Sequence, residues 1–205
     1  MLIIGLTGSI GMGKSTAAAR FLAHGIAVFD ADAEVHRLYE GPLAGEVEAA
    51  FPGTTAADGK VDRAKLSAQL LKAPERMKVL EAIVHPRVRE NERAFLAAEH
   101  ARGARMVVLE IPLLFESGAD KAVDAVVVVS AAPEIQRARV LERPGMTQAK
   151  LDSLLSRQLA DDEKRARAHF VVDTGGSIDA SHAQIDAIIA QLKPRSGTAY
   201  ARFWS

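Results

Sequence analysis

Residues 8–15 read GSIGMGKS and fit the pattern G-x-x-x-x-G-K-[ST] of a phosphate-binding loop, the Walker A motif. The glycines lack a Cβ atom, so the backbone can turn tightly and bring its N–H groups against phosphate oxygens. Lys14 supplies a positive charge for the outer phosphates, and Ser15 supplies a hydroxyl oxygen for Mg²⁺. The residues that we expect to contact the nucleotide here are Gly11, Met12, Gly13, Lys14, Ser15 and Thr16.

The segments on either side of this loop match the context that the motif requires. The apolar run 2–6 predicts a short buried strand, and residues 15–24 predict a helix that ends at Gly25. The helix would point the positive end of its dipole at the bound anion. Strand, loop and helix together therefore favour a true phosphate site over a chance glycine-rich turn.

Two aspartates follow the second predicted strand, 26–29. Because ligands of open α/β sheets lie beyond the carboxyl ends of the strands, Asp30 and Asp32 are expected near the phosphate loop. If the chain stays extended, their side chains face the same way. One of the two is expected to serve as a helix N-cap or turn residue, and the other is a candidate general base.

Residues 33–100 are predicted to be nearly all helical, which is far longer than a crossover between strands requires. Such an insertion is typical of a second binding surface. Pro86 disfavours helical backbone at the residue before it, so a boundary or kink is predicted at His85. His85 is a candidate substrate contact, although a lone histidine is more often structural.

A third strand, 105–110, ends in Glu110, and Pro112 should end its ladder pairing. A buried strand that ends in an acid resembles the Walker B motif, in which the carboxylate holds Mg²⁺, often through water. The pattern is short, and many buried strands end in an acid by chance.

After a fourth strand, 125–129, a helix is predicted to begin at Pro133 and to carry three arginines, Arg137, Arg139 and Arg143. Arg139 and Arg143 are four residues apart, so they should share one helix face. An arginine-bearing helical hairpin suits a lid over ATP, where guanidinium groups neutralise charge on the transferred phosphoryl group. The alternative is a solvated helix with surface ion pairs.

Composition excludes several other classes of function. Lys plus Arg and Asp plus Glu both number 26, so no global basic field favours nucleic acid. The chain has no cysteine, which excludes disulfides and thiolate metal sites and fits a reducing cytosol. No apolar run is long enough to span a membrane, and no signal peptide is expected, so we predict a cytoplasmic location.

The chain resembles the dephospho-coenzyme A kinase family over about residues 3–192. The segments that carry the resemblance are GLTGSIGMGKST (5–16), Asp30-Ala31-Asp32, His85-Pro86, PLLFE (112–116), the set Gln136, Arg139 and Arg143, and Val172-Asp173 with Gly176. The phosphate loop alone is shared by many nucleotide-hydrolysing enzymes. The other segments, in this order and at these separations, are much more specific.

The resemblance implies that ATP, with Mg²⁺, phosphorylates the ribose 3′-hydroxyl of dephospho-coenzyme A, the last step of coenzyme A synthesis. It implies that Asp32 is the base for that hydroxyl and that Lys14 and Ser15 handle phosphates and Mg²⁺. Arg139, with Arg143, would contact ATP from the lid. His85 and Leu114 are expected on the substrate side.

The chain departs from the family pattern at three positions. Ser9 stands where the family often has glycine, and Ser153 stands where it often has arginine. Thr174 stands where it often has asparagine, so any side-chain contact to adenine is in doubt.

The resemblance further implies an α/β fold of the P-loop NTPase type, with three α/β/α layers and a five-stranded parallel sheet. We expect one domain over 1–205 with four parts: a core (about 1–32, 101–132 and 168–192), a helical substrate region (about 33–100), a lid (about 133–167) and a flexible tail (193–205). The expected form is a monomer or small homo-oligomer.

Two other functions fit parts of the pattern. A P-loop kinase of another small hydroxylated metabolite or nucleoside would use the same chemistry with a different helical insertion. A nucleotide-dependent switch that binds a protein partner would hydrolyse nucleotide without an acceptor. The absence of a clear Asn-Lys-x-Asp guanine-reading motif argues against a GTPase switch.

Overall fold

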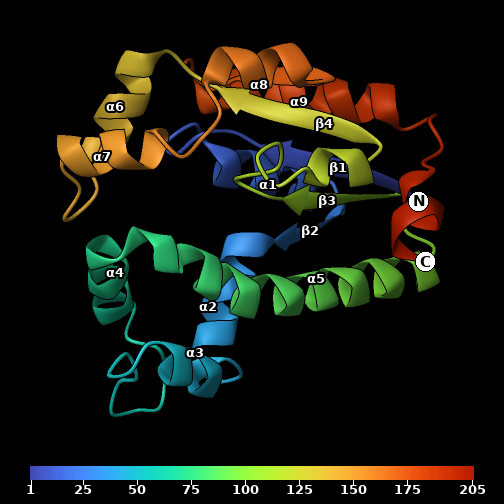
Figure 1. Cartoon of the computed structure of the whole chain (residues 1–205). Coiled ribbons are helices and arrows are strands. Elements are labelled where there is room, and N and C mark those ends of the chain that lie inside the picture. The colour runs from blue at the N-terminus through green and yellow to red at the C-terminus, as the bar shows by residue number, and fades with distance from the viewer. The chain divides into compact units, whose positions relative to one another are not determined.

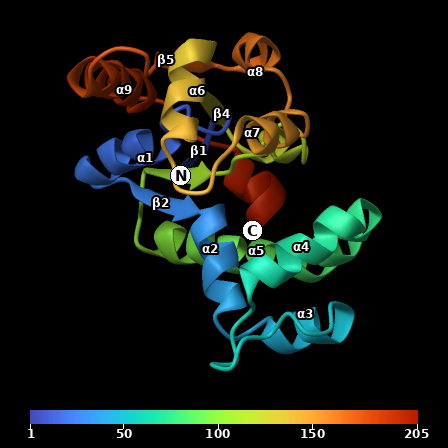
Figure 2. The same ribbon diagram turned by 90° about the vertical axis from the view of Figure 1, so that its left-hand side faces the viewer.

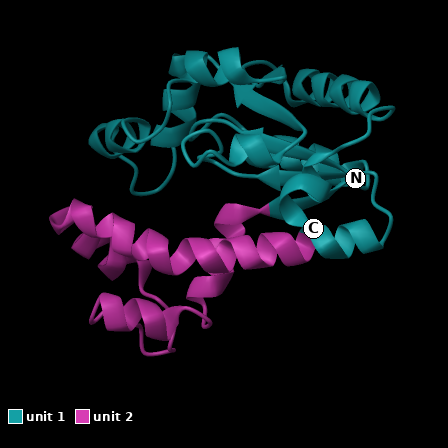
Figure 3. Ribbon diagram, turned by 45° about the vertical axis from the view of Figure 1, so that its right-hand side comes forward, with its two compact units in different colours: residues 1–29, 96–205 teal, residues 30–95 magenta.

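The computed structural model describes all residues, 1–205, and the chain divides into two compact units (Figure 3). The core unit comprises residues 1–29 and 96–205, and the helical unit comprises residues 30–95. The helical unit is close to the substrate region predicted over 33–100, but it begins and ends a few residues earlier.

A five-stranded sheet forms the centre of the core unit, with the order β2-β3-β1-β4-β5 (Figure 1). Its strands are β1 (Leu2–Thr7), β2 (Ala27–Asp30), β3 (Met106–Glu110), β4 (Ala125–Ser130) and β5 (Phe170–Asp173). β1 pairs in parallel with both β3 and β4, and β4 pairs in parallel with β5. Every residue of β1 and β4 is buried, as expected for strands that are covered on both faces. The predicted fold class is confirmed.

Helices and loops cover both faces of this sheet. Phe21 of α1 (Lys14–Ala23) and Ile185 of α9 (Ile178–Leu192) belong to one apolar cluster with the even-numbered residues of β1. Val126 and Val128 of β4 pack on the other face with Leu114 and Phe115. The remaining helices of this unit are α6 (Pro133–Leu141), α7 (Gln148–Leu155), α8 (Asp161–Arg167), the 3₁₀ turn Ala119–Ala122 and a π-helical turn, Tyr200–Trp204.

The helices α2, α3, α4 and α5 are labelled in Figure 2, and the helical unit has a hydrophobic core of its own. It contains α2 (Ala31–Tyr39), α3 (Ala44–Ala50), α4 (Arg63–Lys72), the 3₁₀ turn Pro74–Arg76 and most of α5 (Met77–Ala101). Leu43, Val47 and Phe51 are fully buried in its core. No helix of the structure combines the length and apolarity that a membrane span requires.

Pro86 does not interrupt its helix, so of the boundary or kink predicted at His85 the boundary is wrong. The helix α5 runs from Met77 to Ala101 with Pro86 inside it. A proline in a helix removes one hydrogen bond, here to the carbonyl of Ala82, which is an exposed residue that water can reach. Val84 and Val88, on either side of the proline, pack into the core of the helical unit, and this packing offsets the loss.

The tail, 193–205, which we expected to be flexible, makes several contacts with the rest of the core unit. The backbone N–H groups of Thr198 and Ala199 donate to Asp124 Oδ1 at 2.6 and 2.9 Å. Trp204 Nε1 donates to the carbonyl of Ala122 at 2.8 Å, and the Tyr200 ring stacks on His100 at 4.2 Å. These partners lie far away in the sequence, so the tail is held by tertiary contacts.

Candidate functional site

The phosphate loop connects β1 to α1, and two of its glycines are required by their surroundings. Gly11 has a φ of 78°, and a Cβ atom there would lie 2.5 Å from the side chain of Val140. At Gly8 a Cβ atom would lie 2.5 Å from the carbonyl oxygen of Val129. Because L side chains rarely adopt such a φ and backbone atoms cannot yield easily, larger residues would distort the loop.

Lys14, Ser15 and Thr16 form the first turn of α1, at the mouth of the loop. Lys14 Nζ donates to the carbonyl of Gly8 at 2.8 Å, so the side chain folds back over the loop. Ser15 and Thr16 are exposed to solvent. This helix N-terminus, with a cation and a hydroxyl beside it, suits a phosphate group.

Thr174, directly after β5, holds the phosphate loop through a hydrogen bond to its backbone. Its hydroxyl lies 2.9 Å from the carbonyl of Met12 and 3.1 Å from that of Ser130. The hydroxyl has one hydrogen, so it donates to one of them at a time. The Met12 sulfur accepts the Ala131 N–H at 3.1 Å. From the sequence alone, Thr174 is noted only as a departure from the family pattern. In the structure its hydroxyl bonds to the backbone carbonyls of Met12 and Ser130.

Arg139 is the arginine of α6 that reaches this region. Its Nη2 donates to the carbonyl of Thr174 at 2.6 Å, so the guanidinium lies beside a residue that holds the phosphate loop. Arg143 does not share a helix face with it, which corrects that expectation. The helix ends at Leu141, and Arg143 lies in the exposed turn before Pro144.

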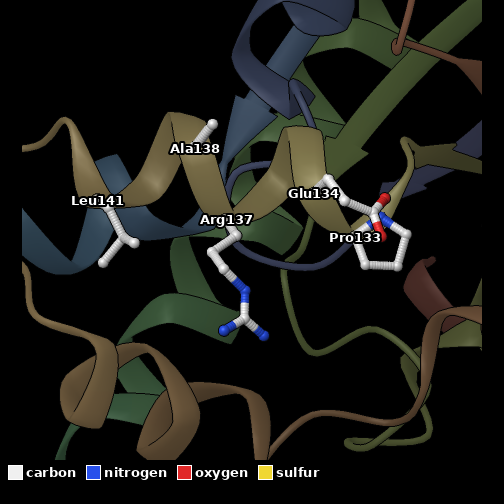
Figure 4. A pocket seen from close by; sticks show the side chains of 5 residues that line it. All are labelled: Pro133, Glu134, Arg137, Ala138 and Leu141. Carbon is white, nitrogen blue, oxygen red and sulfur yellow. The ribbon is translucent and has the colours of Figure 1, made fainter.

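Arg137 lies on a different face of α6 and lines a separate hollow (Figure 4). The hollow has a volume of about 460 Å³, and its lining residues are Pro133, Glu134, Arg137, Ala138 and Leu141. All of them come from one helix, so no polar groups converge on it from several elements, as they do in most ligand sites. We therefore do not assign it to the nucleotide.

Glu110 is the last residue of β3 and pairs in register with Leu6, two residues before the loop begins. It is 6% exposed, so its carboxyl group is nearly buried beside the base of the loop. Thr7 Oγ1 donates to the carbonyl of Pro112 at 3.1 Å and joins the two strand ends. Glu110 is therefore placed where a Walker B carboxylate would be needed.

The PLLFE segment has a structural role in the core unit. Leu114 is fully buried in the sheet core, so the prediction that it contacts substrate is not supported by its position. The Glu116 carboxylate accepts the Leu159 N–H at 2.7 Å and lies 3.0 Å from the ammonium group of the fully buried Lys164. Burial alone would raise the pKa of Glu116, but the Leu159 N–H and Lys164 outweigh it and hold that pKa below its usual value.

Asp30 and Asp32 have different local roles. Asp30 is the N-cap of α2 and accepts the Ala33 N–H at 2.9 Å, which confirms that one of the pair is a cap. Helix α2 begins at Ala31, so the condition of an extended chain is not met, and Asp32 lies in the first helical turn. Asp32 and the exposed His85 belong to the helical unit, and their roles toward a nucleotide remain predictions.

No group of three or more His, Asp or Glu side chains is arranged to hold a metal ion. The residues beside the loop nevertheless offer one hydroxyl, on Ser15, and one carboxylate, on Glu110. Mg²⁺ prefers oxygen ligands and usually keeps waters and substrate phosphates in its coordination shell, so this pair fits it.

Comparison with known proteins identifies close relatives. The family model described as dephospho-CoA kinase matches residues 2–180. A dephospho-CoA kinase of Mesorhizobium japonicum is 53% identical, and the match covers 97% of this chain and 100% of the relative. A solved structure from Thermus thermophilus is 38% identical with a TM-score of 0.79, covering 93% of this chain and 97% of that one. The dephospho-CoA kinase structure from Campylobacter jejuni, 24% identical over 94% of this chain and 97% of its own, shares the fold with a TM-score of 0.72.

Proposed function

Because this chain belongs to the dephospho-CoA kinase family of phosphotransferases, we propose that it transfers the γ-phosphoryl group of ATP to the ribose 3′-hydroxyl of dephospho-coenzyme A. The product is coenzyme A, so the reaction is the last step of its biosynthesis. The observation that carries the proposal is a family match over most of the chain, together with an intact phosphate loop between β1 and α1.

ATP would bind with its outer phosphates on the loop. Phosphoryl transfer depends on in-line positioning and on neutralising charge more than on covalent chemistry. The backbone N–H groups of residues 11–16 would hold the phosphates, and Lys14 would leave the Gly8 carbonyl to pair with them. Loop and lysine thus fix the group that is transferred.

Arg139 would stabilise charge on the transferred group from the side of α6. Its guanidinium lies at Thr174, which contacts the phosphate loop, and this position supports the proposed role. Arg143, in the turn after α6, would be a second and more exposed contact to ATP. Guanidinium groups suit this role because they stay protonated and bind phosphate oxygens in pairs.

Asp32 would orient the 3′-hydroxyl and accept its proton as the phosphoryl group transfers. An ionised aspartate is a weak base, so its main contribution would be orientation of the attacking oxygen. His85 on α5 would contact the substrate from the same unit. The helical unit would thus supply the acceptor side of the reaction, and the core unit the nucleotide side.

Ser15 would bind Mg²⁺ directly, and Glu110 would bind it through water. When bound, Mg²⁺ would neutralise part of the charge on the phosphates. We further propose a cytoplasmic enzyme that acts on a small molecule, as a monomer or small homo-oligomer.

Mass spectrometry of dephospho-coenzyme A incubated with ATP, Mg²⁺ and the protein tests the proposal. The expected result is a gain of one phosphoryl group on the nucleotide ribose. The same assay with a sugar acid and a nucleoside as acceptors addresses the alternative kinases. Phosphorylation of one of these, with dephospho-coenzyme A unchanged, would refute the proposed substrate.

A further inference from the structure

A single residue of the phosphate loop, Ile10, has both of its backbone polar groups bound by glutamine side chains. Gln136 Nε2 donates to the carbonyl of Ile10 at 2.8 Å. The N–H of Ile10 donates to Gln158 Oε1 at 3.2 Å. The backbone partner determines whether the side-chain nitrogen or oxygen of each glutamine is used, because a carbonyl only accepts and an N–H only donates.

In sequence, the two glutamines lie near the beginning and just after the end of the helical hairpin formed by α6 and α7. Gln136 lies on α6 and is 7% exposed. Gln158 follows the end of α7 by three residues. Its neighbour Leu159 is tied to Glu116 through the backbone N–H, so the chain at Gln158 is anchored to the core unit. Both ends of the hairpin therefore meet at the loop.

Gly11, the next residue of the loop, packs directly against α6. A Cβ atom there would lie 2.5 Å from the Val140 side chain and 3.1 Å from the carbonyl of Gln136. Glycine-rich segments lose much conformational freedom when they become ordered. Contacts that hold the loop before ATP binds therefore reduce the conformational entropy that the loop loses on binding.

We infer that Gln136 and Gln158 are positioning residues for the phosphate loop, which they hold at Ile10 in the shape that receives the nucleotide. The inference deepens the proposed function and rests on it only in taking ATP as the ligand. Neither glutamine touches the reacting atoms. Their effect reaches the phosphates through the backbone of residues 10–13.

Amide hydrogen exchange at Ile10 in the nucleotide-free protein, measured by NMR, tests the geometry. Gln158→Ala removes the acceptor, so exchange of the Ile10 N–H is expected to speed up about ten-fold or more. Gln158→Glu keeps an acceptor oxygen and is expected to preserve the protection. Gln136→Glu instead sets a carboxylate against the Ile10 carbonyl and is expected to loosen the loop.

Binding of a non-hydrolysable ATP analogue with Mg²⁺, measured by calorimetry, tests the consequence. Gln136→Ala and Gln158→Ala are each expected to raise the Kd about five-fold to ten-fold, the scale of one lost hydrogen bond. Gln191→Ala, which truncates an exposed glutamine of α9, is the matched control and should leave the Kd unchanged. Circular dichroism checks that each variant is folded.

Equal Ile10 exchange in the wild-type protein and Gln158→Ala would overturn the inference, and so would an unchanged Kd in both alanine variants. If Gln158→Ala fails to fold, the contrast between Gln158→Glu and Gln136→Glu still decides it, since loss of protection in both, or in neither, contradicts the geometry. None of these measurements uses dephospho-coenzyme A. A wrong acceptor would therefore leave them intact, whereas a wild-type protein that binds no ATP analogue would refute the proposed function itself.

Discussion

The surroundings of the phosphate loop and helix α5 of the helical unit differ in how their buried polar side chains are bonded. Around the phosphate loop, the side chains of Thr174 and Gln136 are buried and bond to loop carbonyls. In the helical unit, Glu92 is 6% exposed, and its Oε1 makes no hydrogen bond within the protein. Burial raises the pKa of Glu92 to about 7, against a smaller opposing effect of Arg89. The contrast indicates that buried hydrogen bonds hold the phosphate loop, while the stability of the helical unit is expected to respond to pH.

Lys14→Ala should have the largest effect, because it removes the positive charge of the phosphate loop that is proposed to pair with the outer phosphates of ATP. We expect no detectable phosphoryl transfer in a coupled assay for ADP formation. Retention of wild-type activity would show that the phosphate loop does not act as proposed. The core unit could then no longer be assigned to nucleotide binding.

Asp32→Asn tests whether the helical unit supplies a chemical group. We expect kcat to fall about 10²-fold or more, the scale of a lost general base, while binding of ATP persists. Asp30→Asn is the matched control, because asparagine also caps a helix and kcat should change little. Near-normal turnover by Asp32→Asn would remove this residue from the mechanism.

Glu92→Gln tests whether the stability of the helical unit depends on pH through this one carboxyl group. A buried carboxyl that titrates near 7 rather than at its ordinary value of 4.5 favours folding while it stays protonated. The unfolded chain loses this proton first, so stability should fall by about 3 kcal/mol between pH 4.5 and 7 and then level off. Glu92→Gln should flatten that decline in urea unfolding followed by circular dichroism. The same slope in variant and wild type would assign the pH dependence to other groups.

Thr174→Val should have the smallest of these effects. Valine keeps the shape but loses the hydroxyl that bonds to Met12, so the loop is less well held. We expect the KM for ATP to rise roughly five-fold, about the effect of one hydrogen bond, with kcat little changed. Thr174→Ser, which keeps the hydroxyl, should stay close to wild type. An equal loss in both variants would point to packing instead.

Local sequence patterns were sufficient for the sheet, the loop and several helix ends. The apolar run that became β4 and the glycine loop before Lys14 carry their signals within a few residues. Asp62, an aspartate directly before a helix, is the N-cap of α4 and accepts two backbone N–H groups, a role that such a local pattern indicates. The family followed from these motifs taken together, and the expectation of a five-stranded parallel sheet followed from the family; the strand order came only from the structure.

The errors have local or long-range causes that can be named. Arg143 precedes Pro144, which disfavours helix at that residue, so the sequence did contain a signal for the end of α6. Pro86 stays in a helix because residues on both sides of it are packed, which no local pattern reports. Gln158 contacts a residue 148 positions away, and only the fold brings the two together.

Trp204 is the only tryptophan of the chain, and its indole N–H is bonded to Ala122 within the core unit. Its fluorescence therefore reports on the core unit, whereas circular dichroism sees the helices of both. The protein therefore carries an intrinsic optical probe for the core unit. A gap between the two melting curves would measure how far the helical unit can unfold while the core unit stays intact.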